Sequence, residues 1–270
     1  MFTKLLAYEI RSRYRANARS FGAFIVTIAA ASGIVAAGLP GISGSTAVLA
    51  YALCALTPVA CAIAAMADYW KTLYGQRGYF TMSLPVSGTT IFWAKTTRMV
   101  IECLLALALA VGGIIAVASA AAWSDGISLA EYTAGPRSLV AGVPTSTVAI
   151  MIVVQVLVSL SWLVQGSAVM SIGAEGRFNH MGFGAPIIGF VLLYIVNQVL
   201  STVGTFFLPL SVTTDGHFST EIMWTSYLAT MGTEGQPNVI GIGSYVLVPL
   251  FALVMGLWAS RSIEKHTSLR

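Results

Sequence analysis

The chain has 270 residues, of which 57% are hydrophobic and only 9% are charged. A soluble globular domain typically carries about 25% charged residues, so this composition excludes a soluble protein and indicates an integral membrane protein. The net charge is +4, and the basic residues are dispersed at the ends of apolar runs. That pattern reflects orientation in a lipid bilayer, so we expect no nucleic acid as a partner.

The first segment, residues 1–20, predicts an amphipathic helix that lies in the membrane interface. Apolar residues recur on one face at four-residue steps: Phe2, Leu6, Ile10 and Tyr14. Basic residues gather on the opposite face: Lys4, Arg11 and Arg15. Glu9 and Arg13 lie on the apolar side with i, i+4 spacing, and we expect them to neutralise each other. The basic segment is too long for a signal peptide.

Residues 21–270 predict an all-α domain of six transmembrane helices, because a helix needs about 20 apolar residues to cross a bilayer. The expected spans are Phe21 to Leu39, Thr46 to Ala67, Met99 to Ala122, Ser146 to Ile172, Gly182 to Leu200 and Val239 to Ser260. Small residues at four-residue spacing in the third span predict a close helix contact at Gly112, Ala116 and Ala120. We interpret the three cysteines, Cys54, Cys61 and Cys103, as small buried apolar residues.

The basic residues predict the orientation of these spans. Of the 14 Lys and Arg residues, all but Arg137 fall on one side of the membrane under this layout, so both termini are expected in the cytoplasm. The second long outer loop, residues 201–238, exceeds a simple connection, and its apolar clusters suggest segments that re-enter the bilayer.

The cytoplasmic loop of residues 68–98 joins the second and third spans. Residues 79–84 are apolar enough for a short surface helix, and Pro85 should end it because proline supplies no backbone N–H. Ser87 is expected to cap the following helix. The alternative interpretation is an ordinary interfacial loop with aromatic anchors.

The sequence offers little to catalysis. It has no phosphate-binding loop and no H-E-x-x-H motif, and its three histidines fall in predicted loops or the tail. We therefore expect no enzyme activity, no cofactor and no metal site on this chain.

Few charged or amide side chains lie within the predicted spans. Glu102 follows Arg98 by four residues, so we expect an interfacial ion pair there, with a coupling role as the alternative. Four amides remain: Gln155, Gln165, Asn197 and Gln198. They form either interhelical hydrogen bonds or part of a substrate path, and the sequence leaves both interpretations open.

The phrase GYFTMSLPVS, at residues 78–87, together with six spans and an interfacial N-terminal helix, resembles the permease subunits of type-2 ATP-binding-cassette (ABC) exporters. Many bacterial members carry a similar phrase in this loop. The resemblance implies that residues 2–14 form the elbow helix and that residues 205–231 contain the re-entrant helices. It also implies that the loop contains the coupling helix that docks on the ATPase, with contacts from Tyr79, Phe80, Met82, Leu84 and Pro85.

The resemblance further implies a function. The chain would be the permease of an ABC exporter in a bacterial plasma (inner) membrane, moving an apolar or amphipathic substrate such as a peptide, drug or lipid. Its expected partners are a separate ABC ATPase subunit, which carries the ATP and Mg²⁺, and a second permease subunit, identical or homologous. The alternative is a membrane scaffold or sensor subunit that transports nothing.

Overall fold

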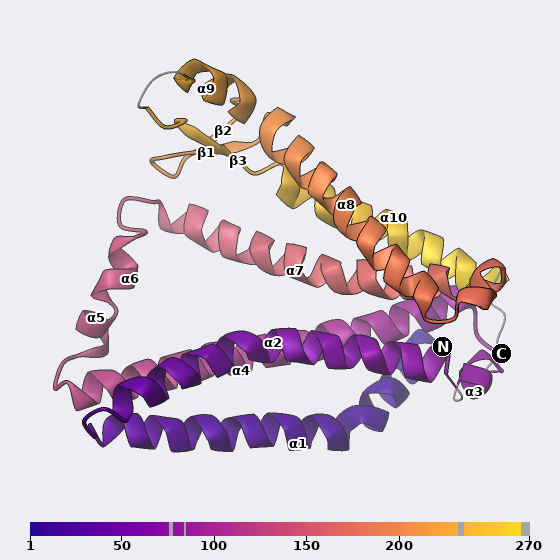
Figure 1. Ribbon diagram of the computed structural model, residues 1–270, viewed down its shortest axis with the longest axis horizontal. Coiled ribbons are helices and arrows are strands. Elements are labelled where there is room, and N and C mark those ends of the chain that lie inside the picture. Colours follow the sequence, from indigo (N-terminus) through magenta and orange to yellow (C-terminus); the bar gives the residue numbers. More distant parts are fainter. Residues whose placement is uncertain (76–77, 84, 232–234, 266–270) are drawn as a thin grey trace. The chain divides into compact units, whose positions relative to one another are not determined.

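The computed structural model describes residues 1–75, 78–83, 85–231 and 235–265, and it is predominantly helical (Figure 1). Its long helices are α1 (Phe2–Ala36), α2 (Ser43–Leu73), α4 (Gly88–Ser124), α7 (Thr145–Gly173), α8 (Gly184–Phe207) and α10 (Ser244–Lys265). Each is long and apolar enough to cross a bilayer. The prediction of a helical membrane protein with six spans is confirmed.

Four of these helices extend several residues beyond the predicted spans on the side expected to be cytoplasmic, and one of them is α10, which ends at Lys265 rather than at Ser260. α1 runs without a break through both the predicted interfacial segment and the first span, although its first turns leave the line of the rest of the helix (Figure 1). α2 continues to Leu73, and α4 begins at Gly88 rather than near Met99. The charged residues next to the spans are therefore helical, which gives them fixed positions on helix faces.

The chain divides into two compact units. The first comprises Met1–Lys71 and Ala94–Leu139. In it α1, α2 and α4 share a buried apolar cluster, and two short helices follow α4, α5 (Leu129–Tyr132) and α6 (Ala134–Ser138). The cluster consists of Phe24, Ile28, Ala50, Cys54, Ala110 and Val117.

The close contact of α4 in this unit occurs at Gly113. A Cβ atom added there would lie 2.7 Å from Sγ of Cys54 and 3.3 Å from Cζ of Phe24. Gly112 and Ala116 are exposed instead, and a Cβ atom on Gly112 would meet nothing within 4 Å. The predicted stripe of small residues is thus wrong at these two positions, because the packed face of α4 lies one residue further along the helix.

The second unit comprises Thr72–Trp93 and Val140–Arg270. Here α7, α8 and α10 pack side by side (Figure 1). Glycines permit the close approach: a Cβ atom on Gly173 would lie 2.8 Å from the backbone N of Pro186. The same unit contains α3 (Gly78–Met82) and a 3₁₀ helix, η1 (Gly176–Met181), between α7 and α8.

The segment between α8 and α10 contains both short strands and a helix. Its described residues form an antiparallel sheet of β1 (Ser211–Thr213), β2 (Phe218–Ser219) and β3 (Val239–Gly241) in the order β2-β1-β3, together with the helix α9 (Met223–Thr230). Trp224 of α9 lies 5.5 Å from Phe207 and 6.1 Å from Phe206 between ring centroids. The sequence did not predict the sheet, because strands of two or three residues are too short to show an alternating pattern.

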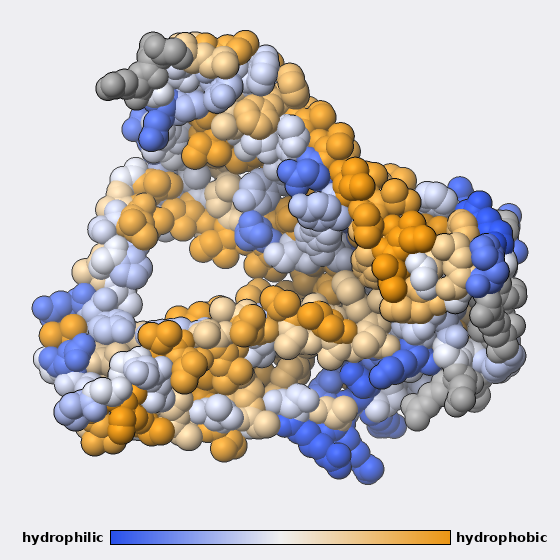
Figure 2. Space-filling view, viewed as in Figure 1, coloured by the Kyte–Doolittle hydropathy of each residue, from blue (hydrophilic) through white to orange (hydrophobic). Residues whose placement is uncertain are grey.

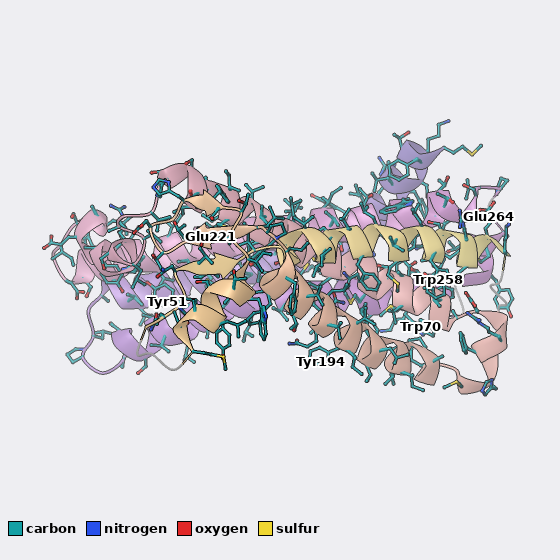
Figure 3. All side chains as sticks on the ribbon, turned by 90° about the horizontal axis from the view of Figure 1, so that it is seen from above. Tyr51, Trp70, Tyr194, Glu221, Trp258 and Glu264 are labelled. Carbon is teal, nitrogen blue, oxygen red and sulfur yellow. The ribbon has the colours of Figure 1, made fainter. Side chains whose placement is uncertain are left out.

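Burial follows a pattern opposite to that of a soluble protein. Large apolar side chains are exposed along the helices, as the hydrophobic surface of α8 illustrates (Figure 2). Tyr194 on α8, labelled in Figure 3, is 63% exposed, whereas Lys95, Arg98 and Gln165 are at most 1% exposed. Exposed apolar surface of this extent needs a nonpolar solvent, which a bilayer provides.

Candidate functional site

The short helix that the sequence predicts before Pro85 is present as α3, a helix of five residues. The hydroxyl of Thr81 donates a hydrogen bond of 3.0 Å to the carbonyl of Thr72 in α2, and Thr81 is buried. The Tyr79 side chain is 55% exposed, and Met82 is half-buried. The helix is therefore fastened to the end of α2 and presents an aromatic side chain to its surroundings.

The end of this segment agrees with the predicted caps. Ser87 Oγ accepts a hydrogen bond from the backbone N–H of Thr90 at 3.3 Å, so Ser87 caps α4 as expected. Pro85 is exposed and lies outside both helices. Leu84 and the Phe80 side chain, two of the positions that the sequence singled out, lie outside the described residues.

A cluster of six charged side chains joins α1, α2 and α4 within the first unit. We call it the ion-pair cluster; its members are Glu9, Arg13, Asp68, Lys95, Arg98 and Glu102. Three are acidic and three are basic, so the cluster has no formal net charge. This balance matters because an unpaired ion in a low-dielectric interior costs several kcal/mol.

Arg98 lies at the centre of the ion-pair cluster and is fully buried. Its Nη1 donates to Oε1 and Oε2 of Glu102 at 2.8 and 3.0 Å, and its Nη2 donates to Oδ2 of Asp68 at 3.0 Å. Lys95 Nζ donates to Oε1 of Glu9 at 2.8 Å. The predicted pair of Arg98 and Glu102 is confirmed, although it is one part of a larger arrangement.

The predicted partner of Glu9 is wrong. Glu9 pairs with Lys95 on α4, and Arg13 pairs with Asp68 on α2 at 3.3 Å. If Glu9 paired with Arg13 within α1, the buried Lys95 would lose its carboxylate partner. The observed contacts between helices instead give Glu9 and Arg13 each an oppositely charged partner. The first turns of α1 are thereby tied to the first turns of α4.

A cavity of about 480 Å³ lies beside the ion-pair cluster, within the first unit. Its walls come from α1 and α2, and Glu102 of α4 contributes one carboxylate. The Asn17 amide, which also lines the cavity, donates to Oε1 of Glu102 at 2.7 Å. The cavity has polar residues at one end and apolar side chains such as Phe24 and Leu53 along its length.

Two of the four predicted amides meet in the second unit. The Asn197 amide of α8 donates to Oε1 of Gln165 on α7 at 2.7 Å, and Gln165 donates to the carbonyl of Val248 on α10 at 3.1 Å. Both side chains are buried, and the bonds connect three helices. This geometry is what interhelical hydrogen bonding predicts.

The other two amides are exposed and do not join this link. Gln155 accepts a hydrogen bond of 3.1 Å from the hydroxyl of Tyr245 on α10. The Gln198 side chain is exposed on α8. The four amides therefore do not gather at one place, and a role in a substrate path stays a prediction.

Sequence reasoning missed most of the ion-pair cluster, although a signal was present. Lys95, Arg98 and Glu102 are spaced by three and four residues, which places them on one helix face. The predicted third span begins at Met99, which places Lys95 and Arg98 in the preceding loop. The contributions of Glu9 and Asp68 required the packing of α1 and α2, which the sequence does not reveal.

These features define a multi-pass helical membrane protein with a buried, charge-balanced cluster and a short helix between its second and third spans. No family model, no curated protein and no solved structure matches the chain. Among the described residues, no group of three or more His, Cys, Asp or Glu side chains is placed to hold a metal ion.

Proposed function

We propose that this chain is the permease subunit of a type-2 ABC exporter, which moves an apolar or amphipathic substrate with ATP hydrolysed by a separate subunit. The observation that carries the proposal is α3: a short helix with an exposed tyrosine, in the phrase that resembles the coupling helix, between two membrane-length helices. A docking helix must present side chains to a partner and be fastened to the spans that it moves.

The contacts of this segment within the second unit support such a role. Thr81 is bonded to the end of α2, and the next helix begins against α10, because a Cβ atom on Gly88 would lie 2.8 Å from the backbone N of Glu264. A displacement of α3 would therefore act directly on the end of α2, and through the chain that follows α3 on the start of α4.

Affinity purification of the tagged chain from its native membranes tests the proposal. We expect an ATPase with a phosphate-binding loop to copurify and to be identified by mass spectrometry. Tyr79→Ala should weaken this association, since truncation of an aromatic anchor in a pocket commonly costs about 2 kcal/mol or more, roughly thirtyfold in affinity. Phe80→Ala tests the neighbouring aromatic position in the same way.

Tyr194→Ala is the matched control, because it removes a similarly exposed tyrosine from the surface of α8. It should leave recovery of the ATPase unchanged. If no ATPase copurifies with the parent chain, the permease assignment is wrong and the result favours the scaffold or sensor interpretation. Normal recovery with both Tyr79→Ala and Phe80→Ala would show that this loop is only an interfacial anchor.

A further inference from the structure

The second unit contains an apolar cavity between its three long helices. The cavity measures about 480 Å³ and is bounded by α7, α8 and α10. Its walls are almost entirely aliphatic and aromatic, with Val169 from α7, Leu192 and Val196 from α8, and Phe251 and Met255 from α10. This size falls within the range of about 300–1,000 Å³ that is typical of ligand pockets.

One end of this cavity is polar and basic. Arg177 and Trp258 line both the apolar cavity and an adjoining cavity of about 380 Å³, whose walls also include Glu175, Arg261 and Ser262. Figure 2 shows the hydrophobic surface of α8 giving way to hydrophilic surface at the end where η1 lies. Trp258 projects from α10 toward α8 at this boundary (Figure 3).

Contacts with its neighbours position the Arg177 side chain without occupying all of its donors. Its Nε lies 2.7 Å from Oε2 of Glu175, whose own side chain is only 5% exposed, and its guanidinium lies 4.6 Å from the centroid of the Phe178 ring. No hydrogen bond joins its two terminal nitrogens to a described residue. Arg261 on α10 is exposed and has no ion pair among the described residues.

We propose that these two cavities form one binding site for an anionic phospholipid, with an acyl chain in the apolar cavity and the phosphate between Arg177 and Arg261. Guanidinium groups bind phosphate oxygens through paired N–H donors, and Arg177 has such a pair unoccupied. Trp258 lies where the acyl chain of the lipid would meet its headgroup, and amphipathic indole rings are common at such membrane interfaces. The occupant must be both apolar and anionic, and a membrane lipid supplies both properties in one molecule.

The location of the site fits this ligand. The predicted orientation places η1 and the end of α10 on the cytoplasmic side, where basic pockets between transmembrane helices bind anionic headgroups. Two arginines and one glutamate leave one net positive charge. At about 1 kcal/mol per basic residue near the surface, this predicts a preference of about fivefold for an anionic over a zwitterionic lipid. The inference does not depend on the proposed transport function.

Quenching of Trp258 fluorescence by brominated lipids tests the proposal on the full-length chain. The protein is reconstituted with brominated phosphatidylglycerol or brominated phosphatidylcholine at equal mole fractions, and the Trp258 signal is the difference from the Trp258→Phe variant. We expect about fivefold tighter binding of the anionic lipid. The double variant Arg177→Gln/Arg261→Gln should bind both lipids equally.

Arg137→Gln is the matched control, because Arg137 is an exposed arginine on α6 in the first unit. It should leave the preference unchanged, and Arg177→Lys should retain part of it in a protein that elutes like the parent on size exclusion. Equal quenching by the two lipids in the parent, or an undiminished preference in the double variant, would overturn the proposal. Free glycerol phosphate that competes as strongly as the lipid would also overturn the proposal, because the site would then recognise the phosphate group without an acyl chain.

Discussion

At the scale of single residues, the ion-pair cluster is the feature that most constrains the chain. Lys95 and Arg98 are almost completely buried, and every one of the six members lies within 4 Å of an oppositely charged member. Such an arrangement gains little over an apolar core of similar volume, but losing one partner is costly. We therefore expect the cluster to select which faces of α1, α2 and α4 associate and their register along the helix axes.

Lys95→Met should destabilise the protein strongly, because it leaves the buried Glu9 carboxylate without its 2.8 Å partner. Breaking a buried pair in this way costs about 3–5 kcal/mol. The measurement is the fraction of monodisperse protein that remains in detergent after heating, assayed by size exclusion.

Two further variants complete this test. Lys4→Met removes an exposed lysine from the same end of α1 and should have little effect. The double variant Glu9→Gln/Lys95→Met removes both charges and should recover much of the lost stability. Equal stability of Lys95→Met and the parent would contradict the arrangement of the cluster.

At the scale of the helices, close packing depends on where glycine faces a neighbour. Gly112 and Gly113 are adjacent in α4 but differ in surroundings, because successive residues point about 100° apart around a helix. Only Gly113 faces the side chains of Cys54 and Phe24. Substitution by alanine brings the same gain in helix propensity at both positions, so the difference in stability between the two variants reports packing alone.

Gly113→Ala should lower stability, and Gly112→Ala should raise it. Alanine favours a helix over glycine by about 1 kcal/mol, which Gly112→Ala gains without meeting any atom within 4 Å. At Gly113 the new Cβ atom would lie 2.7 Å from Cys54 Sγ, and overpacking of this kind costs about 1–3 kcal/mol. Unfolding of the two variants in a denaturing detergent titration measures the difference. A higher stability for Gly113→Ala than for Gly112→Ala would show that the packed face of α4 has been misassigned.

At the scale of the whole molecule, the orientation in the membrane is the property that function requires and that basic residues predict. All but one of the 14 Lys and Arg residues lie on the side expected to be cytoplasmic. The exception is Arg137, in α6. The asymmetry predicts that α3, η1 and the end of α10 lie on the cytoplasmic side.

Cysteine labelling in whole cells tests this orientation. Ser128 lies between α4 and α7 and Thr214 between α8 and α10, both at exposed positions that are predicted to face outward. Ser128→Cys and Thr214→Cys should therefore react with an impermeant thiol reagent. Ser83→Cys, exposed at the end of the α3 segment, should react only after the cells are permeabilised. The parent chain sets the background from its native cysteines. Labelling of Ser83→Cys in intact cells would reverse the predicted topology.

The amino-acid sequence alone determined the class, the number of spans and the cap of α4. Each of these depends on local composition: apolar length for a span, and a serine before a helical run for the cap. The short helix after α2 was also predictable, because Pro85 limits it at one end. These features need no knowledge of which helices are neighbours.

Only the tertiary structure decided the partners. Glu9 pairs with Lys95, 86 positions away in the sequence, and Gln165 bonds to Asn197 and to the carbonyl of Val248. The packed face of α4 and the short sheet beyond α8 belong to the same category. The physical reason is that buried charges and amides are satisfied by whichever group the packing brings within hydrogen-bonding distance, and the spacing of residues along one helix does not specify that neighbour.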